Sequence, residues 1–96
     1  MTEKLYYKDR YLKEFTANII EYKKEDNKHS VVLDRTAFFP GGGWQWCDLG
    51  YIDEIRVLNV IEDKNKIYHI LESEPKRTEN IKCTIDWSRR FDGMQQ

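Results

Sequence analysis

The segment IRVLNVIEDKNKIYHIL, residues 55–71, decides the fold class of this 96-residue chain. Two apolar runs rich in β-branched residues, 55–61 and 67–71, flank the polar tract of residues 62–66. Such runs on either side of a polar turn predict an antiparallel β-hairpin. Alternation divides the first run into two faces, one with Ile55, Val57, Asn59 and Ile61 and the other with Leu58 and Val60. We therefore expect this strand to be covered on both faces.

Strand signals continue on both sides of this hairpin. Upstream and downstream, the pattern predicts a strand at 15–22, a polar turn at 23–29, and further strands at 30–33, 50–52 and 81–85. Six or seven short strands joined by polar connections predict an all-β fold. We expect a small antiparallel β-barrel, closed or partly open, because closure removes exposed strand edges.

Composition limits the classes of function. A chain of this length forms one small domain. Its formal net charge of −1 and isoelectric point near 6.1 lack the basic excess expected of an independent nucleic-acid binder. Cys47 and Cys83 have no Cys-x-x-Cys or histidine partner nearby, so reduced, packed thiols are favoured over a disulfide or a metal site. Without a signal peptide or an apolar run of about 20 residues, we expect a cytoplasmic protein with no membrane contact.

Two further motifs stand out. TAFFPGGGWQWCDLG, residues 36–50, places three glycines in a row between apolar segments. Glycine repeats lose much backbone entropy on folding, and are tolerated mainly where positive φ or close approach is required. IDWSRRFDGMQQ, residues 85–96, reads as the opening of a helix capped by Asp86. We therefore expect a β-barrel module over residues 1–86 and the start of a helix over residues 87–96.

These two motifs resemble those of the alanyl-tRNA synthetase-related editing proteins, and the resemblance covers nearly the whole chain. The first match comprises Arg35, Thr36, Ala37, Phe38, Pro40, Gly42, Gly43, Gln45, Asp48 and Gly50. The second comprises Ile85, Asp86, Trp87, Arg89, Arg90, Phe91, Asp92, Met94, Gln95 and Gln96. The chain departs from the first motif at Gly41, Trp44, Trp46 and Cys47, where the family has Glu, Gly, Pro and Ser.

The resemblance implies a barrel like the second domain of translational GTPases, followed by an α/β editing domain. In the family that second domain binds zinc through a His-x-x-x-His pair with a later Cys and His, and hydrolyses misacylated tRNA. Zinc is therefore expected in the editing domain, which this chain lacks. We expect no metal ligand and no catalytic residue here, because His29 reads as a turn residue and His69 as a strand-face residue.

The resemblance also suggests contacts for the glycine loop and the chain end. Gly42, Gly43, Gln45 and Asp48 would pack against the editing domain near the tRNA acceptor end, with backbone N–H groups and the Gln45 amide reaching sugar or phosphate. Trp44 and Trp46 would stack on an unpaired base, a contact worth about 1–3 kcal/mol. Arg89 and Arg90 are candidate phosphate contacts. The alternatives are a sharp barrel corner for the glycines, core or interdomain packing for the tryptophans, and pairing with Asp86 or Asp92 for the arginines.

Together these features predict the N-terminal accessory barrel of an alanyl-tRNA editing protein. Its task would be to position the editing domain and alanine tRNA for removal of wrongly attached serine or glycine. The parent protein would be a zinc-dependent deacylase, whereas this chain alone is expected to be inactive. Two alternatives remain open: an RNA- or protein-binding module that works alone, and an inert fragment whose loop has diverged.

Overall fold

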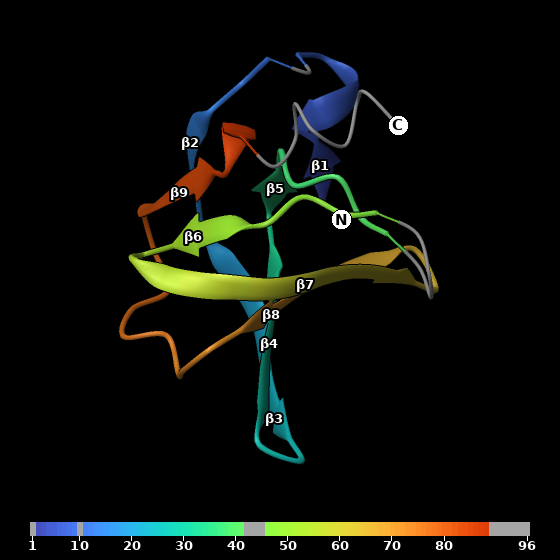
Figure 1. Ribbon diagram of the computed structural model, residues 1–96. Helices are drawn as coiled ribbons and strands as arrows, with labels where there is room; N and C mark the ends of the chain where they lie inside the picture. Colours follow the sequence, from blue (N-terminus) through green and yellow to red (C-terminus); the bar gives the residue numbers. More distant parts are fainter. Residues whose placement is uncertain (1, 10, 42–45, 89–96) are drawn as a thin grey trace.

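The computed structural model describes residues 2–9, 11–41 and 46–88. Seven strands form one antiparallel sheet in the order β2-β9-β6-β7-β8-β4-β3 (Figure 1). In chain order they are β2 (Glu14–Ala17), β3 (Ile19–Glu25), β4 (Lys28–Leu33), β6 (Gly50–Ile52), β7 (Ile55–Asp63), β8 (Lys66–Leu71) and β9 (Ile81–Ile85). The predicted all-β class is confirmed.

A second, smaller sheet was not predicted. Strand β1 (Glu3–Lys4) pairs in parallel with β5 (Arg35–Thr36), and the 3-10 turn η1 (Leu5–Tyr7) follows β1 directly. The Glu3 amide donates to the Asp34 carbonyl at 2.9 Å. This pairing holds the N-terminal segment beside the start of the glycine motif.

The large sheet is not closed, so of the two expected forms the partly open barrel is the correct one. Its edge strands, β2 and β3, are consecutive in the chain and are separated only by Asn18. Two segments that follow one another without a turn cannot lie antiparallel side by side, which prevents the closing pair. The single strand predicted over residues 15–22 is therefore wrong: it divides at Asn18 and serves both edges of the sheet.

Polar side chains hold this corner together instead. Asp34 accepts hydrogen bonds from the Asn18 backbone and side-chain nitrogens, each at 2.9 Å, and its own amide donates to the Asn18 carbonyl. Nearby, Arg35 Nε donates to the Thr16 carbonyl at 2.7 Å. These bonds connect β5 and the residue before it to β2 and to Asn18, the residue between the two edge strands.

The hairpins turn more tightly than the sequence indicates. Each uses two residues with positive φ, namely Asp26 and Asn27, Asp53 and Glu54, and Lys64 and Asn65. Two successive positive φ angles characterise the type I′ turn, whose twist matches that of the flanking strands. The predicted turns at 23–29 and 62–66 are therefore too long: their outer residues continue the strands as exposed ladder positions.

A register shift between Val57 and Asn59 changes which side of β7 is buried. Ile55 and Val57 face the core before the shift, Val60 faces it afterwards, and Leu58 is exposed. An extra residue in one strand reverses the alternation beyond it. The expectation that β7 is covered on both faces is therefore wrong.

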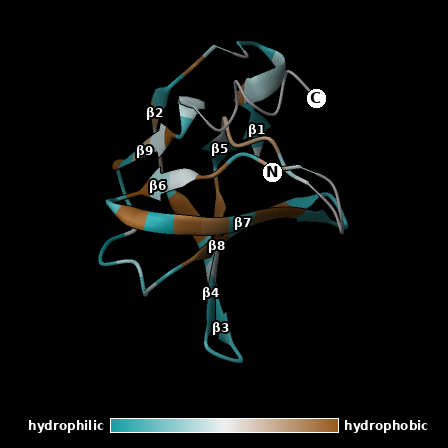
Figure 2. Ribbon diagram, viewed as in Figure 1, coloured by the Kyte–Doolittle hydropathy of each residue, from teal (hydrophilic) through white to brown (hydrophobic). Residues whose placement is uncertain are grey.

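The core lies inside the curled sheet, and Phe38 is at its centre. The Phe38 ring packs edge-on against Phe15 and His69, with centroids 5.8 and 5.4 Å away. Figure 2 shows the hydrophobic middle of β7 and the hydrophilic tip of the β3–β4 hairpin, which extends beyond the core. Trp87 and Ser88 are helical, whereas the remainder of the predicted helix lies outside the described residues.

Candidate functional site

Two hydrogen bonds between Phe39 and Asp48 form a clamp that joins the two sides of the glycine loop. The Phe39 amide donates to Asp48 Oδ2 at 2.8 Å, and the Asp48 amide donates to the Phe39 carbonyl at 3.0 Å. Asp48 is only 1% exposed, so its carboxylate acts inside the fold. Hydrogen bonds to a charged acceptor are stronger than neutral ones, and this pair therefore fixes the two sides of the loop at their base.

Strand β7 holds both sides of the loop above this clamp. On the outgoing side, the Gly41 amide donates to the Val60 carbonyl at 3.0 Å and Gly41 forms a bridge with Ile61. On the returning side, the Cys47 thiol donates to Asn59 Oδ1 at 3.3 Å. The loop therefore starts from a rigid base, whatever its tip contacts.

Thr36 connects the start of the motif to the buried His69. His69 Nδ1 lies 3.1 Å from the Val31 carbonyl, which can only accept, so this nitrogen carries the proton. His69 Nε2 then accepts from the Thr36 hydroxyl at 2.8 Å, and Thr36 Oγ1 accepts from the Phe38 amide at 3.1 Å. Burial lowers the pKa of His69 to about 4, because desolvation disfavours the imidazolium. The imidazole is therefore neutral at pH 7.

Gly50 closes the motif at a point where only glycine fits. A Cβ built on Gly50 would lie 2.0 Å from the Thr84 carbonyl oxygen on the neighbouring strand β9. The sequence predicts such close approach within the run of three glycines, whereas the structure requires it at Gly50. The pairing of β6 with β9 creates this requirement, and it cannot be read from the motif alone.

We define the loop stem as Thr36, Phe38, Phe39, Asp48 and His69. Of the predicted contact residues, Asp48 belongs to the stem and Trp46 is half-buried beside it. Gly42, Gly43, Trp44, Gln45, Arg89 and Arg90 lie outside the described residues, so their contacts with tRNA or a second domain stay predictions. The hydrogen bond between Thr36 and His69 was not predicted from the sequence. The sequence feature that could have indicated it is the histidine within the otherwise apolar strand IYHIL, residues 67–71.

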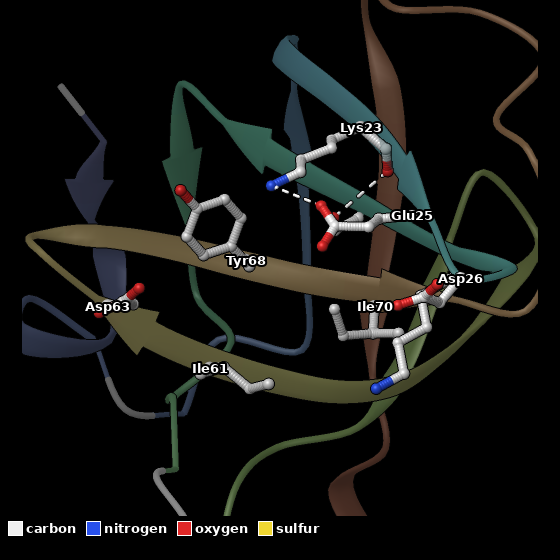
Figure 3. Close-up of a pocket in the computed structure, with 9 residues that line it drawn as sticks. Lys23, Glu25, Asp26, Ile61, Asp63, Tyr68 and Ile70 are labelled. Carbon is white, nitrogen blue, oxygen red and sulfur yellow. Dashed lines mark hydrogen bonds and ion pairs between the residues drawn. The ribbon is translucent and has the colours of Figure 1, made fainter.

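A shallow recess of about 330 Å³ lies across the outer surface of β3, β4, β7 and β8 (Figure 3). Tyr68 stands in it beside Lys23, whose ammonium group lies 2.9 Å from Glu25 and whose pKa is raised by that hydrogen bond. Three carboxylates, on Glu25, Asp26 and Asp63, face two ammonium groups in this recess. Their excess does not favour a phosphate group, so the recess is a poor candidate for tRNA contact.

The histidine and cysteine side chains make hydrogen bonds within the domain. His29 Nδ1 lies 2.9 Å from the Tyr22 hydroxyl, and both ring nitrogens of His69 are hydrogen-bonded within the core. In residues 2–9, 11–41 and 46–88, no three His, Cys, Asp or Glu side chains are grouped to hold a metal ion. Cys47 and Cys83 are both buried, as expected for packed thiols. Burial raises the pKa of Cys83 to about 12.

The fold and the clamped stem define a small all-β domain that holds a glycine-rich loop at a fixed base. No helix in the described part of the chain is long and apolar enough to cross a membrane. The family model for class II (A) tRNA synthetases matches residues 2–89.

Relatives agree with that match. The chain is 45% identical to alanyl-tRNA editing protein AlaX-L and 37% identical to AlaX-M, both from Pyrococcus horikoshii, over 99% of its length. It is 38% identical to alanine–tRNA ligase of Sulfurisphaera tokodaii over 94% of its length. The chain belongs to the class II (A) tRNA synthetase family, in the branch of alanyl-tRNA synthetase and its related editing proteins. It spans 25%, 44% and 10% of these three relatives.

Proposed function

We propose that this chain is the accessory β-domain of an alanyl-tRNA editing protein. It positions an editing domain and the acceptor end of alanine tRNA so that wrongly attached serine or glycine is hydrolysed. The match to editing proteins over 99% of the chain supports this role. In this proposal the hydrolytic step takes place in the editing domain, where the family resemblance leads us to expect zinc.

The observation that carries the proposal is the construction of the loop stem. Thr36 and Asp48 of the family motif are buried and fix the base of a loop. A rigid base places the loop tip reproducibly, and positioned groups contribute to a reaction that occurs elsewhere by holding the substrate in place. Buried clamps at both ends of the motif therefore suit a positioning role.

The test is a transplant into a relative. This chain replaces the matching segment of Pyrococcus horikoshii AlaX-M, and hydrolysis of alanine tRNA charged with serine is measured. We expect hydrolysis with the transplanted chain, and a large loss when the segment is deleted or carries Asp48→Ala. Glu74→Ala is the control, because Glu74 is an exposed carboxylate in the connection between β8 and β9, outside the loop stem. Full hydrolysis without the segment would contradict the positioning role.

The same proteins separate the two alternatives. If the isolated chain binds tRNA with a steep salt dependence, a module that works alone is favoured, although the net charge of −1 argues against it. If the transplant folds but does not hydrolyse, the loop has diverged and the fragment is inert. Circular dichroism of the transplant distinguishes this result from misfolding.

A further inference from the structure

Aromatic side chains, most of them exposed, gather at one end of the molecule, beside the loop stem. We define the aromatic arc as Phe39, Tyr6, Tyr7, Tyr11 and Trp87. Ring centroids of Tyr6 lie 5.1 Å from Phe39 and 4.7 Å from Tyr7, and those of Tyr11 and Trp87 lie 5.9 Å apart in a stacked arrangement. Tyr6, Tyr7 and Tyr11 also line one recess of about 330 Å³. The arc is therefore continuous from the loop stem to the last described residues.

Most of the arc faces solvent. Tyr7 is 75% exposed, Tyr11 62% and Phe39 44%. Single exposed apolar side chains are ordinary, but a contiguous group of large aromatic rings marks an interaction surface. Tyr6 and Tyr7 belong to η1, and Tyr11 lies in the segment after it.

The charges around the arc favour a protein partner over RNA. The Lys4 ammonium group lies 3.1 Å from a Glu62 carboxylate oxygen, and Lys8 pairs with Glu3. Binding of a nucleic acid draws its affinity from cations that neutralise phosphates. Here two of the lysines beside the rings are already neutralised by carboxylates, whereas aromatic rings with a polar margin suit a protein surface.

The position of the arc indicates which protein surface. Trp87 is helical, stacks on Tyr11, and donates from Nε1 to the Leu12 carbonyl at 3.4 Å. The described part of the chain ends at Trp87 and Ser88, at the same end of the molecule as η1 (Figure 1), and Trp87 itself belongs to the arc. More than half of each of the three relatives lies outside the matched stretch.

We infer that the aromatic arc is the surface on which the editing domain docks, next to the stem of the glycine loop. This inference rests on the proposed function and identifies the partner and the surface through which positioning occurs. Phe39 belongs to both regions, since its amide is clamped by Asp48 and its ring contacts Tyr6. A domain seated on the arc is thereby held in register with the loop.

Tyrosine nitration by tetranitromethane tests the inference directly. The isolated chain is compared with the AlaX-M transplant, without tRNA, and each tyrosine is mapped by mass spectrometry. Tyr51 is the matched control, because it is 48% exposed and lies on β6, outside the arc. Tyr6 is an internal measure of folding, because burial raises its pKa to about 12 and should keep it unreactive in both proteins.

In the transplant we expect nitration of Tyr7 and Tyr11 to fall by about fivefold or more, with Tyr51 nearly unchanged. If Tyr7 and Tyr11 were nitrated as readily in the transplant as in the isolated chain, as expected for Tyr51, the inference would be overturned. Protection in the isolated chain that grows with concentration would assign the arc to a second copy, and protection only after tRNA is added would assign it to RNA. Both results also overturn it. Hydrolysis is measured separately, so failed docking is distinguishable from a failed positioning role.

Discussion

The loop stem and the aromatic arc meet at Phe39, yet they are built in opposite ways. In the stem, the side chains of Thr36, Asp48 and His69 are buried and hydrogen-bonded inside the domain. In the arc, Tyr7 and Tyr11 make ring contacts but leave most of their surface in solvent. The motif that identifies the family therefore supports the fold, while the surface suited to a partner lies largely outside that motif. We therefore expect substitutions in the stem to lower the free energy of unfolding strongly, and substitutions in the arc to leave it nearly unchanged.

The largest effect is expected at the end of the motif, at Gly50→Ala. The new Cβ would lie 2.0 Å from the Thr84 carbonyl oxygen, so β6 and β9 must separate. Overpacking against backbone is expected to lower the free energy of unfolding by about 3 kcal/mol. Urea denaturation measures this loss, with Leu58→Ala on the exposed side of β7 as the control. If the two variants had equal free energies of unfolding, the close approach of β6 and β9 would not require glycine at position 50.

Asp48→Ala tests the clamp itself. It removes the acceptor of the Phe39 amide and leaves a part-buried N–H without that partner, which should cost about 2–3 kcal/mol. Asp9→Ala, which removes an exposed acceptor of the Tyr11 amide, should cost about 0.5 kcal/mol. Both are measured by urea denaturation at pH 7. If the two losses were similar, burial would not distinguish the stem from the arc.

Acid should weaken the stem through His69. Its pKa of about 4 in the folded state lies below the ordinary 6.5, so the unfolded chain binds the proton first. Stability therefore falls as the pH decreases from 6.5 toward 4, by about 2 kcal/mol at pH 5 relative to pH 7. Denaturation across this range checks the slope, which should disappear in His69→Gln and persist in the control His29→Gln, where the histidine is only half-buried. A slope unchanged by His69→Gln would show that another group causes it.

The smallest effect on stability is expected in the arc. Tyr7→Ser in the isolated chain should change the free energy of unfolding by about 0.5 kcal/mol or less, because the ring already faces solvent. Thermal denaturation measures this change, with Tyr51→Ser as the control of equal chemistry. A loss as large as that of Asp48→Ala would mean that the arc supports the fold, and the contrast between the two regions would fail.

The resemblance located the glycine motif, but it did not distinguish the residues that fix the base of the loop from those that could contact a partner. Asp48 was grouped with Gln45 and Trp46 as a contact residue, since spacing alone carries no burial. The structure places Asp48 beneath Phe39, where its carboxylate accepts a backbone hydrogen bond. The Thr36–His69 pair joins residues from β5 and β8, and no local pattern predicts such a meeting.

The sequence by itself determined the all-β class, two of the three hairpins and the family, because alternation, turn residues and motifs are local signals. Tertiary structure decided the strand order, which inserts β9 between β2 and β6, and the division of one apparent strand at Asn18. It also decided that β7 has one buried side and that Gly50 must be glycine. These features depend on pairing between segments far apart in the chain, such as Phe15 with Cys83, and that pairing is chosen by the packing of the whole core.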